Sequence, residues 1–124
     1  MPDGGARRGR RSRVTRSGDF DSVYRRGTSA AGRHLVVYAF ERGEGDQPRL
    51  GLSVGKRVGG AVERNRVKRV LREEFARISG SLAPGVDYVV IARPGAHEYI
   101  DERGARALGD RLGELAEKAT GPRS

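Results

Sequence analysis

The sequence contains no cysteine and only two histidines, and these absences exclude several kinds of site. Without thiols, the chain can form no disulfide, no thiolate zinc site and no cysteine nucleophile. The two histidines, His34 and His97, lie far apart in the sequence, and no grouping of carboxylates, histidines and thiols typical of a catalytic site accompanies them. We therefore expect no catalytic residue and no metal site on this chain.

Long hydrophobic runs are also missing. No stretch reaches the roughly 18 consecutive apolar residues that a membrane helix needs. The N-terminal stretch MPDGGARRGRRSRVTR lacks the apolar centre of a secretory signal. We expect a cytoplasmic protein with no membrane partner.

Basic residues are abundant, and they are concentrated in two segments. The 124 residues suit a single domain, and 25 Lys and Arg against 16 Asp and Glu give a net charge of +9. An excess of this size favours a polyanionic partner, either nucleic acid or an anionic membrane surface. Residues 1–18 hold six arginines and one aspartate, and residues 56–77 hold eight basic and three acidic residues. We interpret 1–15 as a flexible basic arm and 16–120 as the folded domain.

Hydrophobic periodicity predicts the main elements. A helix is expected over 17–27, and the alternating runs RHLVVYAF (33–40) and RLGLSVGK (49–56) predict two strands joined as a hairpin through RGEGDQP. The continuous apolar run DYVVIA (87–92) predicts a strand buried on both faces. Leucines at helical spacing over 98–119 predict a terminal amphipathic helix that its glycines weaken.

The run AVERNRVKRVLREEF (61–75) predicts a helix with one apolar side and one basic side. The apolar side should pack on the sheet, so the basic side should face outward. An ordinary solvated helix face is the simplest explanation of such charges. However, five cations and no acid lie between Arg64 and Arg72, whereas a helix selected for solubility would mix the two signs.

The segment GKRVGG just before this helix has the layout of a phosphate site. It places Lys56 and Arg57 next to glycines and to the positive end of the helix dipole. It is not a Walker A loop, because only three residues separate the glycines of GLSVGK and Arg57 replaces the Ser or Thr that would hold magnesium.

Taken together, the stretch GLSVGKRVGGAVERNRVKRVLREEF closely resembles the signature of the bacterial ribonuclease P protein component, and the resemblance extends over residues 13–118. It implies an α+β fold: a single-domain two-layer α/β sandwich in the order αβββαβα, whose mixed sheet contains a left-handed βαβ crossover. Gly55 and Gly60 depart from the family's usual Ser and Asn, so a hydroxyl and a helix-capping amide are missing.

The resemblance also implies a function. In this family an RNA subunit holds the magnesium ions and cleaves precursor tRNA, while the protein binds that RNA and the single-stranded 5′ leader of the precursor. The positions that match the family's contacts to the catalytic RNA are Lys56, Arg57, Arg64, Asn65, Arg66, Lys68, Arg69 and Arg72. The positions that match its leader cleft are Phe20, Tyr24, Val36, Tyr38, Ser53, Arg57 and Arg93.

Other interpretations of the residues remain open. Plain core packing is the alternative for Phe20, Tyr24 and Val36, whereas the polar tips of Tyr24 and Tyr38 favour partial exposure. A structural RNA-binding protein without part in catalysis would need the basic helix but not the cleft. A DNA-binding module is disfavoured because no helix-turn-helix partner accompanies the basic helix, and a stand-alone protein nuclease is disfavoured by the missing catalytic residues.

Overall fold

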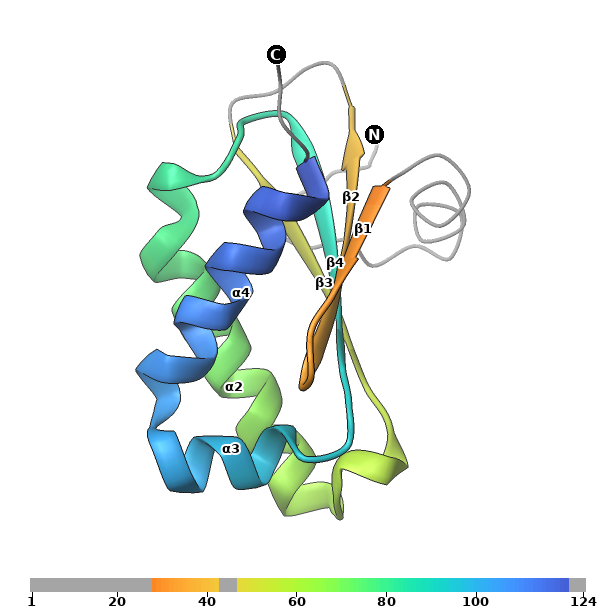
Figure 1. Cartoon of the computed structure of the whole chain (residues 1–124), viewed down its shortest axis with the longest axis vertical. Helices are drawn as coiled ribbons and strands as arrows, with labels where there is room; N and C mark the ends of the chain where they lie inside the picture. The colour runs from red at the N-terminus through yellow and green to blue at the C-terminus, as the bar shows by residue number, and fades with distance from the viewer. Residues whose placement is uncertain (1–27, 43–46, 121–124) are drawn as a thin grey trace.

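The computed structural model describes residues 28–42 and 47–120, which form a four-stranded mixed sheet covered on one side by three helices (Figure 1). The strands are β1 (Thr28–Ala31), β2 (Leu35–Glu41), β3 (Arg49–Val54) and β4 (Val86–Ala92). The helices are α2 (Ala61–Ile78), α3 (Ala96–Arg103) and α4 (Ala105–Thr120), with short 3₁₀ turns at Lys56–Val58 and Ser79–Ser81. The predicted basic arm and first helix, including Phe20 and Tyr24, lie outside the described residues.

The strand order β1-β2-β4-β3 shows that the predicted hairpin of β2 and β3 is wrong. β4 lies between these two strands, antiparallel to β2 and parallel to β3. The physical reason is burial: β4 is the most continuously apolar strand, and six of its seven residues are buried, so it takes a central position. The hairpin is instead formed by β1, a short strand that we did not predict from the residues, and β2.

The two faces of the sheet differ as the alternation predicts. Leu35, Val37 and Ala39 of β2 point to the helices and are buried, while Val36 and Tyr38 point to the other face and are half-buried. On β3, Leu50 and Val54 belong to the core on the helix side. We call the face opposite to the helices the open face; none of the three described helices covers it.

The apolar side of α2 packs on the sheet as predicted. Val67, Val70, Leu71 and Phe75 are buried, and the ring of Phe75 meets that of Tyr88 on β4 edge-on, with 6.0 Å between the ring centroids. α2 connects the parallel strands β3 and β4, so these three elements form the expected βαβ unit. The burial of these apolar side chains determines which side of α2 faces the solvent.

The predicted terminal helix is divided into α3 and α4 at Gly104. This residue has a φ of 94°, a conformation that residues with a side chain rarely adopt, and it ends α3. The leucines Leu108, Leu112 and Leu115 are buried on α4, as their spacing predicts. Within the described ranges, no helix combines the length and the apolar character needed to cross a bilayer.

Candidate nucleic-acid interface

The outward side of α2 carries unbalanced positive charge. Asn65, Arg69 and Arg72 are exposed, and Arg64 and Lys68 are half-buried beside them. Arg69 has an acidic neighbour in Glu73, but their closest atoms are 4.0 Å apart and both side chains are more than 60% exposed. A pair of this kind neutralises little charge, because water screens it. The side of α2 that faces away from the sheet can therefore attract phosphates.

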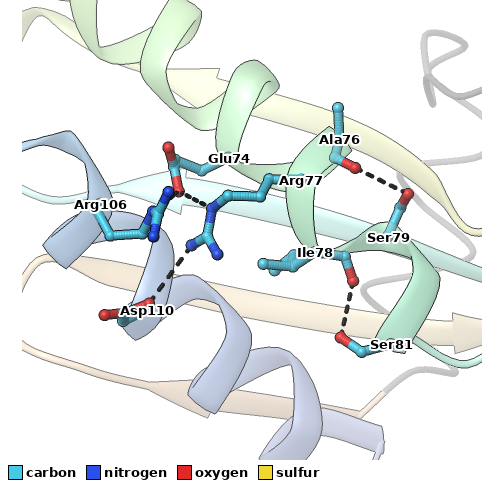
Figure 2. A network of polar contacts seen from close by, with 8 residues as sticks. All are labelled: Glu74, Ala76, Arg77, Ile78, Ser79, Ser81, Arg106 and Asp110. Atoms are coloured by element: carbon cyan, nitrogen blue, oxygen red, sulfur yellow. Dashed lines mark hydrogen bonds and ion pairs between the residues drawn. The ribbon is translucent and has the colours of Figure 1, made fainter.

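The edge of α2 that lies beside α4 carries a balanced set of acidic and basic side chains (Figure 2). Near its C-terminus, Glu74 accepts a hydrogen bond of 2.7 Å from Arg77 and lies 3.8 Å from Arg106 of α4. Arg77 also reaches Asp110 of α4 at 3.4 Å. Acids and bases alternate there, so the excess charge of α2 is confined to its outward side.

The N-terminal end of α2 adds further cations and free backbone donors. Lys56 and Arg57 are exposed on the 3₁₀ turn that precedes the helix, while Val58 of the same turn is buried and fixes its position. Gly60 is the N-cap of α2, and no side chain caps the helix there. The N–H groups of the first turn and the positive end of the helix dipole therefore lie next to two cationic side chains, as the sequence predicts.

Arg66 differs from the other cations of α2, because its side chain contacts α3. Its Nη1 donates a hydrogen bond of 2.5 Å to Oδ1 of Asp101 and lies 3.2 Å from Nε2 of His97. The hydrogen bond from Arg66 lowers the pKa of the Asp101 carboxyl. Sequence reasoning missed both partners, since they lie more than thirty residues away and no local pattern marks them.

The open face brings together Val36, Tyr38 and Ser53, three of the predicted cleft residues. Val36 and Ser53 both pair with Ile91 of β4, so these three residues form one row across the sheet. In the next row, Tyr38 and Gly51 pair with Val89. Ser53 is exposed, and Gly51, which has no side chain, is buried. Val36 does not belong to the core on the helix side.

The cationic cleft residues lie beyond one end of this face. Arg57 follows β3 and Arg93 follows β4, and the two strands run parallel, so both arginines leave the sheet at the same end. The guanidinium of Arg93 donates a hydrogen bond of 3.0 Å to the carbonyl of Gly32, in the turn between β1 and β2. Arg93 therefore lies at the same end of the sheet as Arg57, and its place at the rim of a leader cleft stays a prediction.

At the other end of the open face, a buried carboxylate joins two arginines. Asp87, whose side chain is 3% exposed, accepts two hydrogen bonds of 2.7 Å from Arg49 and pairs also with Arg42. Its oxygens are thus occupied, and a bidentate pair of this geometry is strong. The two arginines therefore compensate the negative charge of Asp87.

The described residues contain no group of three or more His, Asp or Glu side chains that could hold a metal ion. His34 is packed against the ring of Tyr99, with 4.5 Å between the ring centroids, and burial together with Arg33 and Arg111 lowers its pKa. The lowered pKa disfavours the charged form of His34 near neutral pH.

Comparisons with known proteins point to one family. A sequence model described as Ribonuclease P matches residues 9–116. A ribonuclease P protein component from Shouchella clausii is 46% identical over 86 residues, which are 69% of this chain and 70% of the relative. One from Bacillus pumilus is 39% identical over 99 residues, covering 80% and 83%.

Solved structures agree with this result. The RNase P protein from Thermotoga maritima superposes with a TM-score of 0.77 at 31% identity, covering 87% of this chain and 97% of that one. The Staphylococcus aureus RNase P protein superposes with a TM-score of 0.69 at 34% identity, covering 85% and 97%. The α+β fold predicted from the sequence is the fold of these proteins.

Proposed function

This chain belongs to the bacterial ribonuclease P protein family, and from that premise we propose that it binds the catalytic RNA of ribonuclease P and the 5′ leader of precursor tRNA. The family places the chain in a tRNA-processing ribonucleoprotein. The observation that carries the proposal is the outward side of α2, where Arg69 and Arg72 are exposed and Arg69 has only a long, solvent-exposed pair with Glu73 among the described residues. We expect the complex to work in the cytoplasm.

The contact with the RNA subunit is assigned to α2 and to the turn before it. Exposed Arg69 and Arg72 can each neutralise a phosphate, and arginine suits bidentate phosphate contacts better than lysine does. Lys56, Arg57 and the uncapped N-terminus of α2 extend the same surface. A helix N-terminus alone would bind anions weakly, but flanking cations strengthen it.

The leader is assigned to the open face of the sheet. Tyr38 carries a ring on which an unpaired base can stack. Ser53 has a small, exposed side chain and Gly51 has none, so the leader RNA can approach the sheet there. Arg57 and Arg93, at one end of the face, are placed to contact leader phosphates. Phosphate contacts of this kind carry little sequence information, so we expect weak preference among leaders.

Cleavage itself is assigned to the RNA subunit. Magnesium ions that stabilise the phosphoryl transfer would be held mainly by RNA, and this chain would raise affinity for the substrate and reduce the magnesium concentration required.

The deciding experiment is cleavage of a 5′-labelled precursor tRNA at low magnesium. It is carried out with the protein alone, the cognate RNA alone, and both together. Activity in the combination only is expected. Binding of structured RNA without any gain in cleavage would instead indicate a structural RNA-binding protein, and cleavage by the protein alone would overturn the assignment of catalysis to RNA.

Tyr38 provides a test of the leader assignment. Tyr38→Ala should lower the affinity of the reconstituted enzyme for precursor tRNA by about five- to a hundredfold, because one stacking contact is lost. Affinity for mature tRNA, which has no leader, should hardly change. Tyr38→Phe keeps the ring and is the matched control. Equal losses for precursor and mature tRNA would remove Tyr38 from the leader site.

A further inference from the structure

The guanidinium of Arg66 is held by the neighbouring helix α3. Its side chain is 37% exposed, compared with 63% for Arg69. Two acceptors from α3, Oδ1 of Asp101 and Nε2 of His97, contact the same nitrogen, Nη1. Among residues 28–42 and 47–120, no hydrogen-bond partner occupies Nε or Nη2 of Arg66. These two atoms form the edge of an arginine that binds a phosphate in bidentate fashion.

We propose that Asp101 is a positioning residue for RNA binding, which holds Arg66 in the rotamer that presents its Nε and Nη2 edge to a phosphate of the catalytic RNA. The proposal rests on the proposed function, because it presumes that α2 contacts the RNA. Asp101 itself touches no RNA in this scheme. It acts through Arg66, and His97 supports it by accepting at the same nitrogen.

The donors and acceptors of Arg66, His97 and Asp101 are compatible with one another in this arrangement. Arginine is always protonated and can only donate, so a hydrogen bond at this contact requires the tautomer of His97 in which Nε2 accepts and Nδ1 carries the proton. That nitrogen is 3.8 Å from Oδ2 of Asp101. Asp101 therefore faces a positive or donating group with each of its two oxygens. The contacts with Asp101 and His97 both restrict the side chain of Arg66. Arg66 therefore has little conformational entropy left to lose when RNA binds.

The competing possibility is that Asp101 weakens RNA binding. A carboxylate near the interface repels phosphates and occupies a cation that would otherwise be available. Its charge is 53% exposed, however, so solvent and salt screen the repulsion. Asp101 also occupies only one of the three guanidinium nitrogens. The two possibilities predict opposite signs when the carboxylate is removed, and the sign can be measured.

The experiment compares the affinity of four proteins for the cognate ribonuclease P RNA transcribed in vitro, at one fixed salt concentration. The proteins are the wild type, Asp101→Ala, Asp101→Asn and Glu102→Ala. Glu102 is the matched control, since it is an exposed acid next to Asp101 on α3 with no hydrogen bond or ion pair to another described residue. Its removal measures the effect of deleting one negative charge from α3. Thermal unfolding of each variant verifies that the fold is kept.

We expect Asp101→Ala to weaken RNA binding by about three- to tenfold, the range for a long side chain that must be ordered on binding. Asp101→Asn keeps an oxygen that can accept from Arg66, so it should recover most of the affinity. Glu102→Ala should leave the affinity unchanged or raise it slightly. In an Arg66→Ala background, Asp101→Ala should cause no further loss, because the residue through which Asp101 acts is gone.

Several results would overturn the inference. If the Asp101→Ala variant binds RNA as tightly as the Glu102→Ala variant, or more tightly, the carboxylate of Asp101 either has no effect on RNA affinity or competes with RNA for Arg66. A loss of the same size in the Arg66→Ala background would show that Asp101 acts independently of Arg66. If the wild-type protein shows no saturable binding to the RNA, the proposed function fails as well, and this outcome is distinct from the other two.

Discussion

At the level of single residues, Asp87 joins two strands and the end of a third through one buried carboxylate. It lies on β4, and its partners are Arg49 of β3 and Arg42 directly after β2. Asp87→Asn removes the charge of the carboxylate that both guanidinium groups contact. Because both arginines are partly exposed and can turn toward water, we expect a loss of about 2–3 kcal/mol in the free energy of unfolding, somewhat less than for a fully buried pair.

Urea-induced unfolding measures this loss. The matched control is Asp110→Asn, which removes an exposed carboxylate whose closest arginine nitrogen is 3.4 Å away. That variant should change stability by less than about 0.5 kcal/mol. If the two variants are equally stable, the Asp87 cluster is not a stabilising element of the sheet.

The residues that sequence reasoning missed share one physical property. Asp87 and Asp101 bind arginines that lie 35 to 45 positions away along the chain. Local periodicity reports which side of an element is apolar, but it contains no information on which polar side chains meet after folding. Arg66 could therefore be identified as a cation of α2, whereas its contact with α3 could not.

At the level of elements, the start of α2 lacks a cap that one substitution can supply. Gly60 has φ −74° and ψ −175°, which any residue can adopt, and Glu63 stands at the third helical position. Gly60→Ser would complete a capping box with Glu63, whose carboxylate lies close enough to bond back to the N-cap and would have to shift slightly. We expect about 0.5–1 kcal/mol of added stability.

Thermal unfolding tests this expectation, with Gly60→Ala as the control. Alanine restricts the unfolded chain in the same way as serine but offers no oxygen to the helix N–H groups. The Gly60→Ala protein should therefore be less stable than the Gly60→Ser protein by about 1 kcal/mol. Equal stability of the two variants would mean that the capping oxygen contributes nothing.

Two glycines of α4 should respond with opposite signs to the same substitution. A methyl group at Gly113 would lie 3.6 Å from Cδ1 of Ile78, an ordinary contact, so Gly113→Ala should stabilise the helix by about 0.5–1 kcal/mol. A methyl group at Gly109 would overlap the carboxylate of Glu74 and approach its Cγ to 2.7 Å. Glu74 is only 13% exposed and is held by Arg77 (Figure 2).

Gly109→Ala must therefore displace Glu74 from its partners, and we expect it to destabilise the protein by about 1 kcal/mol or more despite the better helix propensity of alanine. Urea-induced unfolding of both variants gives the comparison. Similar stabilisation by both would show that α2 and α4 do not approach each other closely at Gly109.

The elements also show how far a sequence determines a sheet. Alternation correctly predicted that the residues of β2 and β3 divide between two faces of the sheet, because the period of two is a property of each strand alone. It did not predict that β4 separates these strands, since pairing depends on which strand most needs burial on both faces. Likewise, the leucines of α4 were predicted from their spacing, but the break at Gly104 requires a backbone conformation that spacing does not encode.

At the level of the whole molecule, the residues that stabilise the fold lie apart from those of the proposed RNA-binding surface. The helices bury one face of the sheet, and the contacts between α2 and α4 consist of apolar side chains and balanced ion pairs. The unbalanced cations lie on the outward side of α2 and in the turn before it. RNA affinity should therefore depend on where cations lie as well as on the net charge of +9.

Salt dependence of RNA binding can test this distribution, because each protein cation that neutralises a phosphate releases counter-ions. Arg69→Ala with Arg72→Ala should lower the slope of log affinity against log salt by about 1.5–2. Arg103→Ala with Lys118→Ala removes the same charge from α3 and α4, beside a hollow to which α2 contributes no residue. That control should leave the slope nearly unchanged. Equal reductions would mean that net charge, and not the surface of α2, attracts the RNA.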